Sequence, residues 1–179
     1  MRLNRAIFLD RDGTINENRR DYVKSWSEFE FLPNALEGLK RLSKSEYKII
    51  VITNQRAVAR GMMSLAALED IHARMLAEVE GAGGRIDAVY VCAHDTKDGC
   101  NCRKPKTGLL DLAAETFNLD LRGCWMVGDK TQDVQTGVNA CCRTILVATG
   151  YGGGDGLHKI ESNYRAKDLS EAAEIILGD

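Results

Sequence analysis

The 179-residue sequence lacks the features of two large classes of protein. No apolar run approaches the ~20 residues that cross a membrane, and the run at residues 6–9 is too short for the core of a signal peptide. No block of like charge is longer than the pair Arg19 and Arg20, and 24 basic residues face 26 acidic ones. We therefore expect a cytoplasmic protein whose partners include neither a membrane nor a nucleic acid.

A glycine motif for nucleotide binding is also missing. The segment YGGGDG at residues 151–156 has no Lys-Ser or Lys-Thr after it and lacks the G-x-G-x-x-G spacing, so we interpret it as a flexible loop. The sequence contains no internal repeat and no low-complexity tract. With 44% hydrophobic and 28% charged residues, it has the composition of a globular protein. The length predicts one domain over residues 1–179, which we expect to be a monomer.

Short apolar segments predict β-strands at residues 6–9, 48–52, 88–91, 124–127 and 144–147. Their apolar residues are continuous rather than alternating, which is typical of parallel strands covered on both faces. Segments with helical spacing lie between them. One begins after Ser64, a good N-cap, and ends at Gly81, and another begins near Thr131. The alternation predicts an α/β fold with a Rossmann-like, doubly wound, mainly parallel sheet.

Polar residues follow the predicted strands, at the edge of the sheet where such folds bind ligands. Asp10 and Asp12 follow the first strand, Thr53 and Asn54 the second, and Asp129 the fourth. Each residue alone also fits an ordinary turn, because Asp-Gly and Gly-Asp are common at strand ends. Their order, each directly after an apolar strand, favours one shared site.

These residue types suit phosphoryl transfer. Carboxylates at positions 10 and 12 lie on the same side of an extended chain, so one can attack phosphorus while the other transfers the proton. Nucleophile and phosphate are both negative, so a hard cation such as Mg²⁺ is needed, and Asp129 could supply a further oxygen ligand. Thr53 can donate its hydroxyl to the phosphate. Arg103, Lys104 and Lys106 are candidates for the cation that stabilises the transferring oxygens.

Half of the six cysteines lie close to a histidine. Cys92, His94, Cys100 and Cys102 offer the soft ligands of a closed tetrahedral zinc site, although two unrelated surface pairs are the alternative. No ligand position is left for water, so we expect Zn²⁺ to be structural. It would hold a loop that positions Arg103 and Lys104. The remaining cysteines lie in apolar segments and we expect them to be buried: Cys124, Cys141 and Cys142.

The segments FLDRDGT, VITN, RKP and VGDKTQD resemble, in order, the motifs of the haloacid dehalogenase (HAD) superfamily of phosphatases, over nearly the whole chain. The resemblance implies the HAD fold and a phosphoaspartate intermediate. It implies that Asp10 is the nucleophile, Asp12 the general acid and base, and Thr53 the phosphate-binding hydroxyl. It also implies that Lys104 stabilises the transferring phosphate and that Mg²⁺ is held by Asp10, Asp12 and Asp129.

The run CAHDTKDGCNCRKP, with TNQ, ARG and GDK, resembles a subgroup of that superfamily, the heptose 1,7-bisphosphate 7-phosphatases of the histidinol-phosphate-phosphatase-like type. The subgroup carries a zinc loop in place of a large cap, and no stretch after Asp12 or Thr53 is long enough to form a separate lid. The resemblance implies a sugar bisphosphate substrate from nucleotide-activated heptose biosynthesis. It implies these substrate-binding residues: Asn54, Gln55, Arg56, Arg103 and Lys130.

Two departures from the subgroup pattern bear on the substrate. Arg56 and Ala57 stand where serine and glycine are usual, and Ala93 stands where proline is usual. A histidinol-phosphate phosphatase is therefore an alternative. The alternatives from other classes are a phosphoacceptor signalling domain and a zinc-dependent nucleic-acid-binding module. We interpret isolated residues such as His72, Trp26 and Trp125 as helix surface and core packing.

Overall fold

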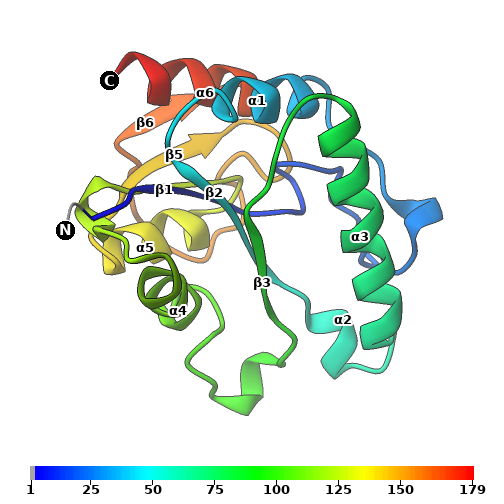
Figure 1. The fold of residues 1–179 in the computed structure, drawn as a ribbon. Coiled ribbons are helices and arrows are strands. Elements are labelled where there is room, and N and C mark those ends of the chain that lie inside the picture. The colour runs from blue at the N-terminus through cyan, green and yellow to red at the C-terminus, as the bar shows by residue number, and fades with distance from the viewer. Residues whose placement is uncertain (1–2) are drawn as a thin grey trace.

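A parallel sheet of six strands organises the structure, a computed structural model that describes residues 3–179 (Figure 1). The strands, in sheet order, are β3 (Ala88–Cys92), β2 (Lys48–Asn54), β1 (Ala6–Leu9), β4 (Trp125–Gly128), β5 (Arg143–Val147) and β6 (Tyr164–Ala166). The chain extends the sheet outward from β1 in one direction and from β4 in the other. Ligands of such sheets bind at the carboxyl ends of the strands near this reversal.

Helices cover both faces of the sheet (Figure 1). One face carries α1 (Ala35–Leu42), α3 (Leu65–Gly81) and α6 (Leu169–Gly178), and the other carries α4 (Gly108–Phe117) and α5 (Thr131–Asn139). The remaining elements are short: α2 (Arg56–Ala59), η1 (Trp26–Glu28), η2 (Thr96–Asp98) and η3 (Leu121–Gly123). The predicted doubly wound α/β fold is confirmed.

Strand side chains alternate between two cores, which explains the continuous apolar runs. In β1, Ile7 and Leu9 join the core under α1, α3 and α6, whereas Ala6 and Phe8 join the core on the α4 side. All four side chains are fully buried. Burying a large apolar side chain contributes about 2 kcal/mol, so β1 is anchored from both faces and Asp10, the next residue, has a fixed position.

Two helix starts agree with the sequence. The Ser64 hydroxyl oxygen accepts a hydrogen bond from the backbone N–H of Ala67 at 3.1 Å, so Ser64 is the N-cap of α3, which ends at Gly81 as predicted. Helix α5 begins at Thr131, two residues after Asp129. Both helices therefore start beside the carboxyl edge of the sheet.

The structure differs from the sequence analysis at three places in the fold. Strand β6 was not predicted, because it has only three residues and its first two are exposed at the edge of the sheet. Cys141 is exposed rather than buried, in a tight turn where its φ is 59°. His72 is buried within α3 rather than on a helix surface, and its partner belongs to the site described below.

No separate cap domain covers the carboxyl edge of the sheet within residues 3–179. The chain between β1 and α1 contains η1 alone, and the chain between β2 and α3 contains α2 alone. In the same part of the chain, no helix combines the length and the apolar character that crossing a membrane requires.

Candidate active site

Three buried carboxylates meet at the carboxyl edge of the sheet, and we call them the carboxylate cluster. Asp10 follows β1, Asp129 follows β4, and Asp133 lies in the first turn of α5. One oxygen of each lies within 4.8 Å of the other two, an arrangement that could hold a metal ion. Carboxylate oxygens are the ligands that Mg²⁺ prefers, so the donor set fits Mg²⁺.

A buried lysine joins two members of the carboxylate cluster. Lys104 Nζ lies 2.9 Å from Asp10 Oδ1 and 2.6 Å from Asp133 Oδ1. Burial lowers the pKa of Lys104, but the two carboxylates outweigh burial and raise it, so the amine stays charged. Asn54 aligns the lysine, because its Oδ1 accepts a hydrogen bond from the Lys104 backbone N–H at 3.2 Å.

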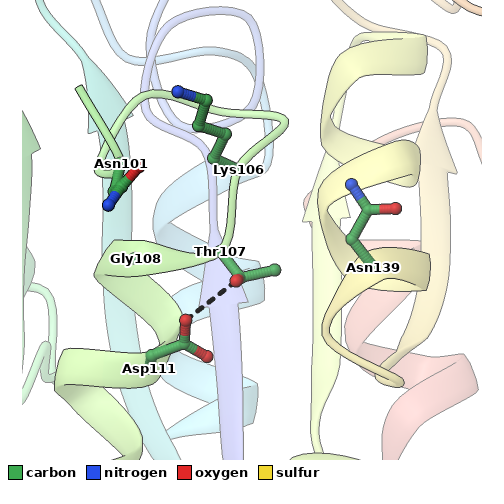
Figure 2. Close-up of a pocket in the computed structure, with 6 residues that line it drawn as sticks. All are labelled: Asn101, Lys106, Thr107, Gly108, Asp111 and Asn139. Atoms are coloured by element: carbon green, nitrogen blue, oxygen red, sulfur yellow. Dashed lines mark hydrogen bonds between the residues drawn. The ribbon is translucent and has the colours of Figure 1, made fainter. Parts of the chain in front are cut away.

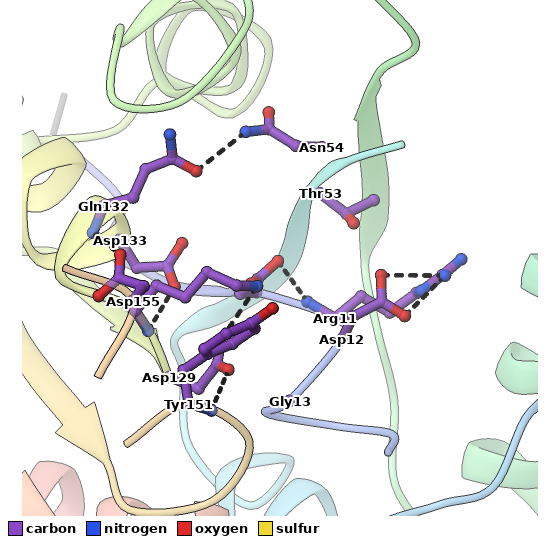
Figure 3. A network of polar contacts seen from close by, with 12 residues as sticks. Arg11, Asp12, Gly13, Thr53, Asn54, Asp129, Gln132, Asp133, Tyr151 and Asp155 are labelled. Carbon is purple, nitrogen blue, oxygen red and sulfur yellow. Dashed lines mark hydrogen bonds and ion pairs between the residues drawn. The ribbon is translucent and has the colours of Figure 1, made fainter. Parts of the chain in front are cut away.

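Asp129 has one oxygen available for a ligand. Its Oδ2 accepts a hydrogen bond from the Tyr151 backbone N–H at 2.8 Å (Figure 3). Its Oδ1 is buried without a hydrogen bond, and Lys130 Nζ lies 3.5 Å away. Burial, together with the charges of Asp10 and Asp133, raises the pKa of Asp129 to about 7, although Lys130 opposes the shift. A bound cation would satisfy this otherwise costly oxygen.

Two glycines make room for Asp129. A Cβ atom at Gly13 or at Gly150 would lie 2.2 Å from Asp129 Oδ2. Both residues also have positive φ, at 90° and 57°, which L side chains rarely adopt. The glycine of the first motif and the glycine before the YGGGDG segment therefore enclose the same carboxylate.

The segment at residues 151–156, which we interpreted as a flexible loop, is tied to the site. The backbone N–H of Gly153 donates to the Asp129 carbonyl at 2.8 Å. Asp155 accepts hydrogen bonds from the backbone N–H and the hydroxyl of Thr131, at 2.9 and 2.8 Å. Asp155 therefore provides a negative group at the N-terminus of α5, where the helix dipole favours one.

Asp12 is held by several donors. Arg11 Nη2 donates to both of its oxygens, at 2.8 and 3.0 Å (Figure 3). Asn16 Nδ2 donates to Oδ1 at 3.0 Å, and Gln55 Nε2 donates to Oδ2 at 2.8 Å. Burial raises the pKa of Asp12, but Arg11 and these hydrogen bonds outweigh burial and hold it below its usual range. Asp12 is therefore ionised and fixed in orientation.

Thr53 is buried at the end of β2 with its hydroxyl proton unused. Its Oγ1 accepts a hydrogen bond from Gln55 Nε2 at 2.8 Å. A hydroxyl that accepts one hydrogen bond can still donate one, so Thr53 can donate to an incoming anion. Gln55 orients both Thr53 and Asp12.

A pocket of about 470 Å³ adjoins the carboxylate cluster. It includes Asp12 and Lys130, and Lys130 Nζ lies 3.6 Å from Asp10 Oδ2. Arg19 and Arg20 also line it, which the sequence did not indicate. The substrate-binding residues expected from the sequence all line this pocket: Asn54, Gln55, Arg56, Arg103 and Lys130. The excess of cationic side chains suits a ligand with more than one negative group.

A second hollow, of about 420 Å³, lies at the start of α4 (Figure 2). Its only hydrogen bond between lining side chains runs from the Thr107 hydroxyl to Asp111, at 2.8 Å. None of the residues of the carboxylate cluster lines it. Lys106, a candidate cation from the sequence, lines this hollow and donates to the carbonyls of Gly99 and Cys100, away from the carboxylate cluster. The candidate site is therefore the first pocket, whose Lys130 reaches Asp10.

The predicted zinc ligands converge after β3, and we call them the thiolate cluster. Cys92 Sγ lies 3.7 Å from Cys100 Sγ and 3.3 Å from Cys102 Sγ, and His94 Nδ1 lies 3.2 Å from Cys102 Sγ. A disulfide requires a sulfur separation of about 2 Å. Two sulfurs bound to one tetrahedral zinc ion at about 2.3 Å lie roughly 3.8 Å apart. The donors and their spacing fit Zn²⁺.

Asp95 joins the loop of the thiolate cluster to the pocket. Its Oδ1 lies 2.6 Å from Arg56 Nη2, and its Oδ2 lies 3.4 Å from Arg60 Nε. The hydrogen bond from Arg56 is the main cause that holds the pKa of Asp95 well below its usual range. In the same loop, Arg103 Nη1 donates to the His94 carbonyl at 3.2 Å. The loop therefore positions two cations of the pocket wall.

Besides Arg19 and Arg20, the sequence did not identify four further residues of the site. Asp133 carried a signal, because it lies one helical turn after Asp129 in a segment already singled out. The contact between Arg11 and His72 and the contact between Asp95 and Arg56 had no sequence signal, because each joins residues far apart in the chain.

The fold and the site together define a HAD-like hydrolase. The HAD-hydrolase-like family model matches residues 101–172, which include Lys104, Asp129 and Asp133. D-glycero-β-D-manno-heptose-1,7-bisphosphate 7-phosphatase of Pseudomonas aeruginosa is 41% identical over 146 residues, 82% of each chain. The protein of the same name from Pasteurella multocida is 34% identical over 98% of each chain. The chain belongs to the family of these heptose-bisphosphate phosphatases.

A solved structure agrees with this family. The D,D-heptose 1,7-bisphosphate phosphatase of B. bronchiseptica, crystallised with magnesium and phosphate, superposes with a TM-score of 0.90 at 36% identity. The match covers 98% of this chain and 99% of that one. The two chains therefore share one fold over almost their whole lengths.

Proposed function

We propose that this protein is a phosphatase that removes the 7-phosphate from D-glycero-β-D-manno-heptose 1,7-bisphosphate. The observation that carries the proposal is the position of Asp10: Lys104 holds one of its oxygens, and its other oxygen lies beside Lys130 at the cationic pocket. Relatives at 34–41% identity bear the name of this activity, including the β anomer. A substrate with two phosphates explains why the pocket needs so many cations.

Asp10 is the nucleophile in this proposal. A carboxylate oxygen of Asp10 forms a bond to the phosphorus of the 7-phosphate, and the bond between phosphorus and the sugar oxygen breaks. Asp12 donates a proton to that oxygen, which leaves as a hydroxyl group. Asp12 is ionised at rest, so it takes this proton from solvent when the negative phosphate arrives and makes the protonated carboxyl more favourable.

The second step frees Asp10, and Asp12 returns its proton to solvent once phosphate has left. Asp12, now a carboxylate, takes a proton from a water molecule as the water oxygen attacks the phosphorus of the aspartyl phosphate. The bond to Asp10 breaks and inorganic phosphate leaves. Thr53 and Lys104 donate to the transferring oxygens and stabilise the negative charge that they carry.

Mg²⁺ is the proposed catalytic metal, and Asp10 and Asp129 of the carboxylate cluster would hold it. Asp12, also expected as a ligand from the sequence, lies outside that cluster, and its carboxylate accepts hydrogen bonds from Arg11, Asn16 and Gln55. When bound, it neutralises negative charge between nucleophile and phosphate and so lowers the barrier to attack. The unsatisfied Oδ1 of Asp129 and the magnesium in the related crystal structure support this assignment. Zn²⁺ is the proposed structural metal of the thiolate cluster, supported by the donor set and its spacing.

The pocket cations divide the two phosphates between them in this proposal. The 7-phosphate lies against Thr53 and Lys104, which Gln55 and Asn54 hold in place. The 1-phosphate lies toward Arg56 and Arg103. Lys130 stands between the two positions. We further propose that residues 1–179 act as one domain, as a monomer in the cytoplasm, with a small molecule as the only ligand class.

Phosphate release tests the proposal directly. The purified protein is given heptose 1,7-bisphosphate as separate α and β anomers, beside histidinol phosphate and fructose 1,6-bisphosphate, with Mg²⁺ present. We expect the highest kcat/KM for the β-heptose compound, with loss of the 7-phosphate followed by ³¹P NMR. Preference for histidinol phosphate would retain the mechanism and overturn the substrate.

A further inference from the structure

Arg11 is a fully buried cation between the two aspartates of the first motif. Its exposed fraction is 0%, and it is among the largest side chains that are fully buried. A buried guanidinium is stable only when its donors find acceptors, because burying an unpaired charge costs several kcal/mol. The acceptors of Arg11 therefore decide where this group lies.

One acceptor comes from a distant helix. Arg11 Nη1 lies 3.0 Å from Nε2 of His72, in the middle of α3, 61 residues later in the chain. Arginine can only donate, so His72 Nε2 is the acceptor and the ring proton lies on Nδ1. Burial, helped by the charge of Arg11, lowers the pKa of His72 to about 4, so the ring is neutral and able to accept at neutral pH.

The other acceptor is Asp12. Arg11 Nη2 donates to both of its carboxylate oxygens, at 2.8 and 3.0 Å. One guanidinium thus joins His72 of α3 to the carboxylate that faces the pocket. Among the described residues, no other side chain accepts a hydrogen bond from the Arg11 guanidinium, and its Nε has no partner.

We propose that His72 is a positioning residue for phosphoryl transfer: by holding Arg11, it aims the carboxylate of Asp12 at the leaving oxygen and at the attacking water. This inference rests on the proposed role of Asp12. Without an acceptor at position 72, Arg11 Nη1 is buried and unpaired, so the guanidinium shifts. The two hydrogen bonds from Arg11 to the Asp12 carboxylate are then distorted and the carboxylate moves. A misplacement of about 1 Å at a reacting group lowers the rate about 100-fold.

The leaving group distinguishes this role from a structural one. A sugar oxygen leaves as an alkoxide unless Asp12 protonates it, so its release depends on where Asp12 points. 4-Nitrophenolate is a stable anion and leaves without a proton. An error in the position of Asp12 should therefore slow the first step with a sugar phosphate and spare the first step with 4-nitrophenyl phosphate.

The experiment measures His72→Leu and His72→Gln by rapid mixing. A sugar phosphate and 4-nitrophenyl phosphate are the two substrates, and Mg²⁺ is saturating for both. Met75→Leu is the matched control, because Met75 is buried one turn further along α3 in an apolar contact. For His72→Leu we expect kcat with the sugar phosphate to fall about 10- to 100-fold. The burst of 4-nitrophenolate should keep its rate within about threefold, followed by slow turnover of the aspartyl phosphate.

The conservative variant should recover function. His72→Gln retains an oxygen that can accept from Arg11, so we expect at least half of the lost sugar-phosphate activity to return. Met75→Leu should stay within about twofold of the parent with both substrates. If His72→Leu does not give a folded protein by thermal melting, His72→Asn, polar but too short to reach Arg11, replaces it and should show the same selective loss.

Several results would overturn the inference. An equal fall in the burst rate and in the sugar-phosphate rate, a smaller burst amplitude alone, or unchanged kinetics in the folded variant would each contradict it. The sugar phosphate can be any alkyl phosphate that the parent hydrolyses, including fructose 1,6-bisphosphate. Failure of the heptose assignment would therefore appear in the parent enzyme, separately from the result for His72.

Discussion

The carboxylate cluster and the thiolate cluster are built in opposite ways. Asp10, Asp129 and Asp133 come from three elements and are all buried, so the whole sheet must fold before their oxygens meet. The thiolate cluster lies within eleven residues of one loop, and all of it except Cys92 is at least partly exposed. The carboxylate cluster can therefore position reacting groups, whereas the thiolate cluster stabilises its own loop and the two pocket cations that the loop holds.

The consequence is that metal loss should act differently at the two clusters. Removing Mg²⁺ should leave the fold intact, because the sheet and Lys104 already hold the carboxylates. Removing Zn²⁺ should loosen the loop, because few apolar side chains support it. The predictions below test this difference, beginning with the largest expected effect.

Asp10→Asn should lower kcat below about 0.1% of the parent value, because the amide cannot form the phosphoaspartate. The thermal melting temperature should not fall, since the substitution removes one negative charge from a crowded cluster. Phosphate release and circular dichroism melting measure the two properties. Asp70→Asn, an exposed carboxylate on α3, is the control. Activity above ~1% would contradict the covalent role.

Omission of Mg²⁺ after desalting should lower turnover at least ~100-fold, and its return should restore it. The melting temperature without substrate should change little, which distinguishes the carboxylate cluster from the thiolate cluster. Titration of Mg²⁺ against phosphate release gives the apparent affinity. A protein that melts many degrees lower without Mg²⁺ would show that the carboxylate cluster depends on its metal for structure.

Cys100→Ser should reduce bound zinc, lower the free energy of unfolding by more than about 2 kcal/mol and raise KM about tenfold, with a smaller change in kcat. The reason is that the loop positions Arg56 and Arg103 without contributing to the reacting centre. Zinc content, urea unfolding and steady-state kinetics measure these effects. Cys141→Ser makes the same change at an exposed cysteine outside the cluster and should be neutral. A Cys100→Ser protein that unfolds and binds like the parent would exclude the zinc site.

Asp95→Asn should have the smallest effect, a rise of about threefold in KM with kcat unchanged. The neutral amide weakens the pairs with Arg56 and Arg60, and partly exposed ion pairs contribute at most about 1 kcal/mol. Asp21→Asn removes an ion pair with Lys24 outside the pocket and should leave KM unchanged. A fall in kcat larger than the rise in KM would show that the loop acts on the chemistry itself.

The sequence predicted most of the sheet because strand β1 and its neighbours are apolar on both faces, and it predicted α3 because Ser64 is an N-cap. It did not predict β6, whose Tyr164 and Arg165 are exposed and give no apolar run. Asp10, Thr53 and Asp129 lie at one edge of the sheet, since each comes at the carboxyl end of a parallel strand. Their support was not predictable, because contacts such as those of His72 and Asp95 exist only after distant segments meet.

The most direct test of the central claim is to locate the phosphoryl group during turnover. The protein is mixed with 4-nitrophenyl phosphate and Mg²⁺, quenched in acid within milliseconds and digested, and the peptides are analysed by mass spectrometry. The account predicts one phosphoryl group on the peptide that contains Asp10, absent in Asp10→Asn. Turnover with no phosphorylated peptide, or with the phosphoryl group on another residue, would contradict it.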